Sequence, residues 1–108
     1  MLNVQKTDLF QRWFDRLKDE MLKASIRLRT ERIELDGYFG KIYPIKGAKN
    51  ISEIKIEMGA GYRVYFNLYI EGSEVWLLSG GDKSTQEKDI NNAKELLKEI
   101  QKEREAKK

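Results

Sequence analysis

The residues that could carry out chemistry in this sequence are lysines, arginines, tyrosines and carboxylates, because its 108 residues include no histidine and no cysteine. This composition excludes Ser-His-Asp and Cys-His catalysis, thiolate metal sites and imidazole general bases. Lys55, Arg63 and Lys83 lie in or beside segments with strand patterns. Guanidinium and ammonium groups bind phosphate oxygens, so these residues could serve a phosphodiester substrate. We expect no metal ion and no cofactor.

Alternation of apolar and polar residues places several of these side chains on one face of a predicted sheet. Ile54, Ile56 and Met58 alternate with polar residues, and a second alternating run follows the connection Gly59-Ala60-Gly61. If the apolar set faces the helices, the opposite, solvent-exposed face carries Lys55, Arg63, Tyr65, Asn67 and Tyr69. Such a face suits RNA, because the cations can bind phosphates and the phenol rings can stack with bases. From the pattern alone, the ordinary solvated face of an antiparallel sheet is the stronger interpretation.

The segment from Gly80 to Gln86 joins the last predicted strand to the last predicted helix. It lacks the spacing of a nucleoside-triphosphate-binding loop, so we do not expect a nucleoside triphosphatase. Free backbone N–H groups at a helix N-terminus attract phosphate, which leaves a binding role open. Ser84 and Glu87 have the spacing of a capping box, so a capped strand-to-helix turn is the simpler interpretation.

Two N-terminal helices are expected to position this sheet. Thr7 is suited to cap a helix with apolar residues at Phe10, Trp13, Phe14 and Leu17, and a second helix is predicted from Glu20 to Leu35. A last helix, from Ser84, has an apolar stripe of Ile90, Ala93, Leu97 and Ile100 and is expected to fray from about Lys102.

The predicted strands are Glu53–Met58, Arg63–Ile70 and Glu74–Ser79, with weaker edge candidates at Leu2–Gln5 and at Lys41–Ile45, where Pro44 suits an edge. The order β, α, α, β, β, β, β, α predicts an α+β fold in which helices pack on a small curved, mainly antiparallel sheet. Residues 1–108 are expected to form a single domain.

The net charge of +3 permits an anionic partner without requiring one. No apolar stretch approaches the ~18 residues of a membrane span, and the first residues lack the pattern of a signal peptide. With no cysteine, the cytoplasm is the expected compartment, without a membrane partner.

Two motifs carry a resemblance to a known family. Gly61-Tyr62-Arg63-Val64-Tyr65-Phe66 and Gly80-Gly81-Asp82-Lys83-Ser84-Thr85-Gln86 occur together, with Asp89-Ile90 after them. In this combination the sequence resembles the "addiction module killer protein" branch of the RelE/ParE superfamily, the HigB-type toxins of type II toxin–antitoxin systems. The resemblance extends over nearly the whole chain.

The resemblance implies a RelE-like fold and an endoribonuclease that cleaves messenger RNA, often at the ribosome, without a metal. It also implies a HigA-like helix-turn-helix antitoxin as partner, and contact with operator DNA only through that antitoxin. Arg63 matches the arginine of the superfamily's Tyr-Arg strand, Lys83 a basic residue after the last strand, and Lys55 a lysine of the preceding strand. With Tyr65 these form the expected catalytic set. The expected substrate-binding residues are Tyr62, Asn67, Tyr69, Asp82 and Gln86.

The sequence departs from the family where acid–base residues are concerned. RelE-type enzymes carry a tyrosine early in the last helix, where this chain has Gln86, Glu87 and Asp89, and the histidines of other HigB enzymes are absent. In the mechanism that we expect, Arg63 stabilises charge on the phosphate and a base deprotonates the ribose 2′-hydroxyl, giving a 2′,3′-cyclic phosphate. Lys55, Tyr65 or a carboxylate (Glu57 or Asp82) are the alternatives for that base.

Two other functions remain open at this point. ParE-like members of the superfamily poison DNA gyrase by protein–protein contact, and an RNA-binding module would protect RNA without cleaving it. Clustering of Lys55, Arg63 and Lys83 would favour the nuclease. Because Arg63 is predicted to be exposed, Arg63→Ala is expected to leave folding nearly intact.

Overall fold

The computed structural model describes all residues from 1 to 108. The elements follow the predicted order, with a short 3₁₀ turn before the last helix. Their bounds are β1 Asn3–Lys6, α1 Asp8–Arg16, α2 Glu20–Asp36, β2 Ile42–Pro44, β3 Ser52–Ile56, β4 Tyr62–Tyr69, β5 Glu74–Gly81, η1 Lys83–Thr85 and α3 Gln86–Ala106.

The five strands form one sheet in the order β1-β5-β4-β3-β2. β1 pairs with β5 in parallel, and every other neighbouring pair is antiparallel. The two weaker candidates are therefore real strands, and both lie at edges as predicted. Pro44 ends β2 at such an edge, where its missing N–H group costs no hydrogen bond within the sheet.

Side chains fix the ends of the two N-terminal helices. The Thr7 hydroxyl accepts a hydrogen bond from the Phe10 N–H group at 3.0 Å and donates one to the Leu78 carbonyl at 2.7 Å, so the cap of α1 is also tied to β5. Asp19 caps α2, and Gly37 ends it with a φ of 70°, a left-handed conformation that glycine adopts without strain.

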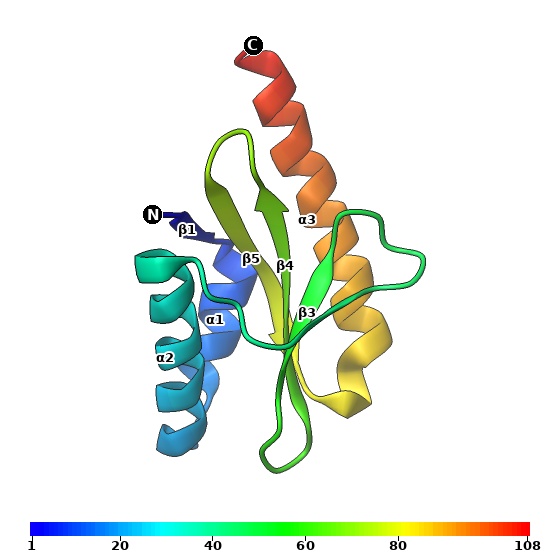
Figure 1. Ribbon diagram of the computed structural model, residues 1–108. Helices are drawn as coiled ribbons and strands as arrows, with labels where there is room; N and C mark the ends of the chain where they lie inside the picture. Colours follow the sequence, from blue (N-terminus) through cyan, green and yellow to red (C-terminus); the bar gives the residue numbers. More distant parts are fainter.

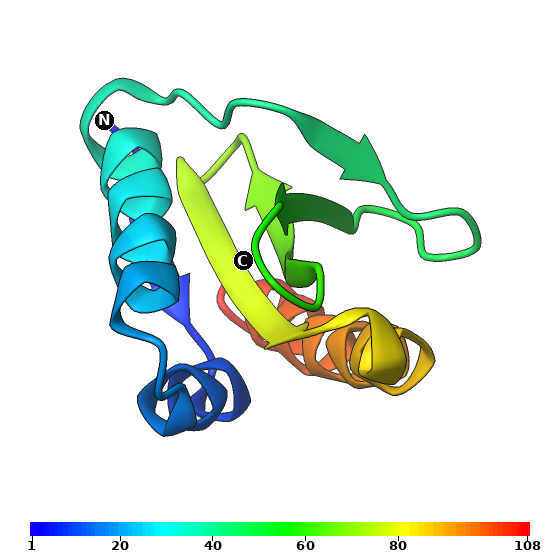
Figure 2. The same cartoon turned by 90° about the horizontal axis from the view of Figure 1, so that it is seen from below.

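α1 and α2 cover one face of the sheet, called here the helix-pair face (Figures 1 and 2). Apolar residues of the three central strands pack there against the two helices, as the alternation predicts. The core of this face is formed by Phe10, Leu22, Ile26, Ile33, Ile54, Ile56, Val64, Phe66, Val75 and Leu77.

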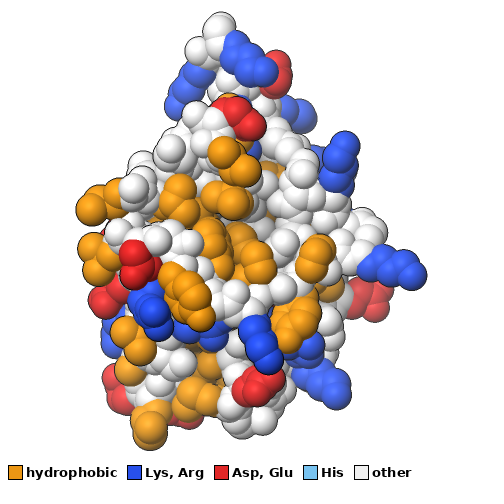
Figure 3. Space-filling view, in the orientation of Figure 1, with side chains coloured by type: hydrophobic (Ala, Val, Ile, Leu, Met, Phe, Trp, Pro, Cys, Tyr) orange, Lys and Arg blue, Asp and Glu red, His pale blue; other side chains and the backbone are white.

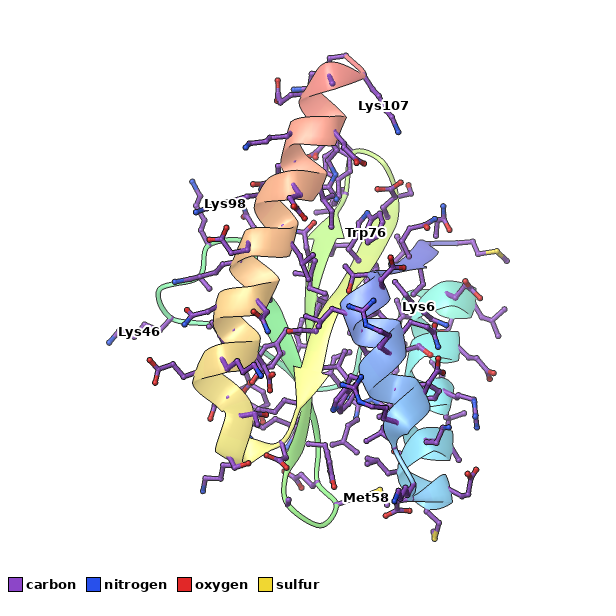
Figure 4. All side chains as sticks on the ribbon, turned by 180° about the vertical axis from the view of Figure 1, so that it is seen from behind. Lys6, Lys46, Met58, Trp76, Lys98 and Lys107 are labelled. Carbon is purple, nitrogen blue, oxygen red and sulfur yellow. The ribbon has the colours of Figure 1, made fainter.

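The opposite face, called here the α3 face, is covered by α3. The prediction that this face is exposed to solvent is therefore wrong. Figure 4 shows α3 crossing this face, with Trp76 beside it on the sheet and Lys98 on the outer side of the helix. A second core fills the interface, formed by Ala48, Ile51, Tyr65, Leu78, Ala93 and Leu97. A register shift at Tyr65/Phe66 interrupts the alternation of β5, so that Ser79 faces α3 like Leu78 before it.

The start of α3 differs from the predicted capping box. Asp82 caps the 3₁₀ turn by accepting a hydrogen bond from the Ser84 N–H group at 2.8 Å, and α3 begins only at Gln86. Gly80 and Gly81 belong to β5. A Cβ atom on Gly80 would lie 2.3 Å from the Trp13 ring, and one on Gly81 would collide with the Asp89 carboxylate. Close packing of α1 and α3 on the two sides of β5 therefore explains this glycine pair.

The C-terminal end of α3 continues past Lys102, where the sequence predicts fraying, to Ala106. Arg104 holds these turns against the sheet. Its guanidinium lies 3.9 Å from the centre of the Tyr69 ring and donates a 3.1 Å hydrogen bond to the Asn67 side-chain oxygen. A third contact joins it to Glu74 at 3.8 Å.

Part of the apolar surface remains uncovered on the side seen in Figure 1. Figure 3 shows hydrophobic side chains gathered over the middle of this view. The large hydrophobic residues that stay exposed in the chain include Leu35, Tyr38, Ile42, Leu68 and Ile70. None of the helices combines the length and the hydropathy needed to span a membrane.

Candidate functional site

The sheet brings two of the three predicted cations together on the α3 face, while the third, Lys83, lies in the turn that follows β5. Lys55 of β3 lies directly opposite Arg63 of β4, and Arg63 lies opposite Gly81 of β5. Lys83 follows Gly81 in the turn before α3 and is exposed. Side chains of directly opposed residues lie close together on the same face, so the pairing places Lys55 and Arg63 side by side.

Glu53 joins the two strand cations, and the sequence analysis did not identify it as a site residue. One carboxylate oxygen lies 3.4 Å from Nε of Arg63 and the other lies 4.0 Å from Nζ of Lys55. The Glu53 side chain is only 7% exposed and that of Arg63 only 13%. Arg63 also donates a 3.0 Å hydrogen bond through Nη1 to the Gly61 carbonyl. One buried carboxylate thus holds both cations, and the group of three carries a net positive charge.

Arg63 is therefore less accessible than the sequence predicts, whereas Lys55 keeps an exposed end. The Lys55 side chain is 39% exposed, and its Nζ lies 4.6 Å from the centre of the Tyr43 ring. Tyr43, on the edge strand β2, was not predicted as a site residue either. Its ring adds an aromatic surface beside the cations.

Tyr65 is on the predicted face, but the prediction that it is exposed is wrong. It lies opposite Glu53 in the β3–β4 pairing and is completely buried beneath α3. Burial, helped by the nearby charges of Glu53 and Asp89, raises the pKa of the Tyr65 phenol well above its ordinary value of 10.0. The phenol is protonated at neutral pH and shielded by α3, so it can neither act there as a base nor contact RNA.

Three of the predicted substrate-binding residues lie away from the cations. Asn67 is buried and its amide donates a 2.8 Å hydrogen bond to the Asn50 carbonyl, while Tyr69 stacks with Arg104. Both belong to the contact that fastens the far end of α3. Tyr62 packs against the core of the helix-pair face, so it lies on the other side of the sheet from the Arg63 side chain.

The other two predicted substrate-binding residues lie in the turn before α3. Asp82 accepts hydrogen bonds from the hydroxyl and the N–H group of Ser84, and these bonds lower the pKa of the Asp82 carboxyl. Its carboxylate is thus used in shaping the turn. Gln86 is the first residue of α3 and is half-buried.

Asp89 is a second buried carboxylate near the turn. Its Oδ2 accepts a 2.6 Å hydrogen bond from the Thr85 hydroxyl, and its carbonyl accepts one of 2.8 Å from the Ser79 hydroxyl. Burial raises the pKa of Asp89 and outweighs the opposing Thr85 hydrogen bond. These contacts fasten the first turn of α3 to β5. The structure holds no group of three or more acidic residues placed to bind a metal ion.

The chain is similar to a protein of Haemophilus influenzae and to several solved structures. It is 41% identical over 99 residues to an uncharacterized protein of Haemophilus influenzae, covering 92% of this chain and 96% of that protein. No protein-family model matches the sequence.

The solved structures include those of an E. coli toxin. A chain of the E. coli RelBE toxin–antitoxin complex has a TM-score of 0.63 at 13% identity, covering 76% of this chain and 96% of that chain. A mutant of the E. coli toxin RelE in the free state also has a TM-score of 0.63, at 14% identity, covering 85% of this chain and 92% of that chain. These likenesses confirm the predicted RelE-like α+β fold.

The burial of the Glu53–Arg63 pair changes what Arg63→Ala should do. Removing Arg63 leaves a buried carboxylate without its main partner, which typically costs about 3–5 kcal/mol of folding free energy. We therefore expect chemical denaturation to show a large loss of stability, and a smaller loss when Glu53→Gln is added. Lys83→Ala is the matched control, because Lys83 is exposed and should change stability by less than about 0.5 kcal/mol. An Arg63→Ala protein as stable as the wild type would contradict the ion pair.

Tyr65 gives the protein an alkaline limit. Its folded-state pKa is raised, so its contribution to stability is fully present below the unfolded pKa, near 10, and is lost as pH rises from there toward the folded value. We expect wild-type stability to fall more steeply than that of Tyr65→Phe above about pH 10. Thermal melts of both proteins between neutral pH and about pH 11.5 measure this difference. Parallel curves for the two proteins would show that Tyr65 is not buried as described.

Proposed function

This chain belongs to the same family as the Haemophilus influenzae protein and has the fold of RelE, and from this premise we propose that it is the toxin of a type II toxin–antitoxin pair. In this proposal it is a HigB-type endoribonuclease that cleaves messenger RNA at the ribosome in the cytoplasm. The observation that supports the nuclease most directly is the cation pair Lys55–Arg63, held by the buried Glu53 at the end of the α3 face.

The geometry of this pair fits a phosphate of the RNA backbone. The exposed end of Lys55 is free to meet a phosphate oxygen, and Nη2 of Arg63 makes no hydrogen bond within the protein. Because Glu53 fixes both side chains in advance, they need little reorganisation when negative charge develops in the transition state. The 2′-hydroxyl would attack the adjacent phosphorus and release a 5′-hydroxyl, leaving a 2′,3′-cyclic phosphate.

The base that accepts the 2′-hydroxyl proton must lie near Lys55 and Arg63, which bind the phosphate in this proposal. The burial of Tyr65 and the Ser84 hydrogen bonds of Asp82 leave these two poorly suited. Glu53 is the carboxylate in ion-pair contact with both Lys55 and Arg63. We assign it only the task of orienting these cations, because its side chain is buried like that of Tyr65. Lys55 and the exposed Glu57, just after β3, remain the alternatives for the base.

Expression of the chain without its antitoxin should stop growth and shorten transcripts. Lys55→Ala leaves the Glu53–Arg63 pair in place and should slow cleavage about 10²–10³-fold, since one donor to the transition state is lost. Lys46→Ala, in the loop between β2 and β3 (Figure 4), is a matched exposed control and should remain toxic. The measurements are colony formation and transcript length.

Two outcomes would replace the nuclease with another function. Intact transcripts accompanied by gyrase-dependent DNA breaks would indicate a ParE-like gyrase poison. Protection of RNA without cleavage by purified protein or by protein on ribosomes would indicate an RNA-binding module.

The proposed partner is an acidic, HigA-like helix-turn-helix antitoxin, through which alone the pair would bind operator DNA. The exposed hydrophobic residues beside α2 and at the end of β4, together with the positive net charge, suit an acidic amphipathic segment. We expect the two proteins to co-elute in gel filtration after co-expression. Separate elution at micromolar concentration would contradict this partner.

A further inference from the structure

We propose that Tyr43 is a stacking platform for the RNA base next to the phosphate that Lys55 and Arg63 bind, so that it contributes to substrate affinity and to the choice of cleavage position. This inference rests on the proposed function. It assigns a substrate-binding role to a residue that neither the sequence motifs nor the predicted site contains.

The position of Tyr43 follows from the strand pairing. Tyr43 lies opposite Glu53, and Glu53 lies opposite Tyr65, so all three belong to one row on the α3 face. Tyr65 in this row is buried under α3, whereas Tyr43, at the edge of the sheet, is 40% exposed. Its row adjoins the row of Lys55 and Arg63, which lies two residues, or about 7 Å, further along the strands on the same face. The ring is therefore at the accessible border of the candidate site.

The contact with Lys55 links the ring to the phosphate-binding group. Nζ of Lys55 lies 4.6 Å from the ring centre, within the range of a cation–π interaction, and 4.0 Å from the Glu53 carboxylate. Lys55 is thus held between Glu53 and Tyr43 with its end still accessible. A phosphate bound by this ammonium group would bring the neighbouring nucleotide to the exposed ring of Tyr43.

A tyrosine at this place suits a nucleobase better than a protein side chain. An exposed ring beside a cation offers a flat apolar surface next to a phosphate-binding group, the combination that single-stranded nucleic acid uses. Stacking of one base on an aromatic side chain typically changes affinity about 5- to 150-fold.

Tyr38 provides an internal control. It is 53% exposed and its ring lies 4.4 Å from the guanidinium of Arg32, so it forms the same kind of pair. It follows α2, however, and makes no hydrogen bond or cation–π contact with Glu53, Lys55 or Arg63. A general effect of losing an exposed tyrosine should appear in both variants, and a stacking role at the site only in Tyr43 variants.

The experiment measures binding of a short single-stranded RNA whose 2′-hydroxyls are all methylated, so that it cannot be cleaved. Fluorescence anisotropy should show affinity reduced about 5- to 150-fold for Tyr43→Leu, and little changed for Tyr43→Phe and Tyr38→Leu. The same RNA with a single abasic position, moved along the strand, should identify one position at which wild-type binding weakens. That position should lose its effect in Tyr43→Leu, because both changes remove the same stack.

The possible results distinguish failure of the stacking role from failure of the proposed function. If wild type binds the RNA and Tyr43→Leu binds it equally well, the stacking role is wrong and the proposed function stands. If no abasic position depends on Tyr43, the stacking role is likewise wrong; this arm uses the wild-type fold and does not depend on the stability of a variant. If the wild-type protein neither binds nor cleaves RNA, free or on ribosomes, the proposed function fails and the inference with it.

Discussion

The packing of α3 across the second face of the sheet determines the environment of every polar residue on that face. It buries Tyr65 and Asn67, leaves the row of Lys55 and Arg63 at its border, and exposes only the edge strand β2 beyond it. Two separate contacts fix the helix: Asp89 with Thr85 and Ser79 at its start, and Arg104 at its end. On this face of the sheet, a large anionic ligand could therefore bind only along the uncovered border.

Electrostatics at this border are set by one buried carboxylate. An arginine that is 13% exposed would lose much of its hydration without compensation, and Glu53 supplies that compensation at 3.4 Å. The same carboxylate reduces the positive charge available to a phosphate, yet two cations against one anion leave an excess. In the proposed nuclease, the arrangement would exchange some attraction for fixed geometry, which is the more useful property when charge develops during a reaction.

Alternation predicted the elements, the edge strands and the side of the sheet on which each strand residue lies, because these depend on local pattern. It could not predict what covers a face. The stripe of Ile90, Ala93 and Leu97 shows that α3 has an apolar side, but not which sheet face it joins. Leu78 belongs to the second core, but it follows Val75, Trp76 and Leu77 in a continuous apolar run that does not indicate which of these residues face which side. Glu53 shares the parity of Lys55, but a carboxylate in a strand pattern does not by itself indicate a phosphate-binding site, because it repels phosphate.

The parallel pairing of β1 with β5 has a consequence for folding of the protein during its synthesis on the ribosome. The Thr7 hydroxyl bonds to a carbonyl 71 residues further along the chain. The first strand and the cap of the first helix therefore cannot reach their final positions until most of the polypeptide has been synthesised. A nascent chain that stops before β5 therefore lacks both the neighbour of β1 and the strand on which α1 packs.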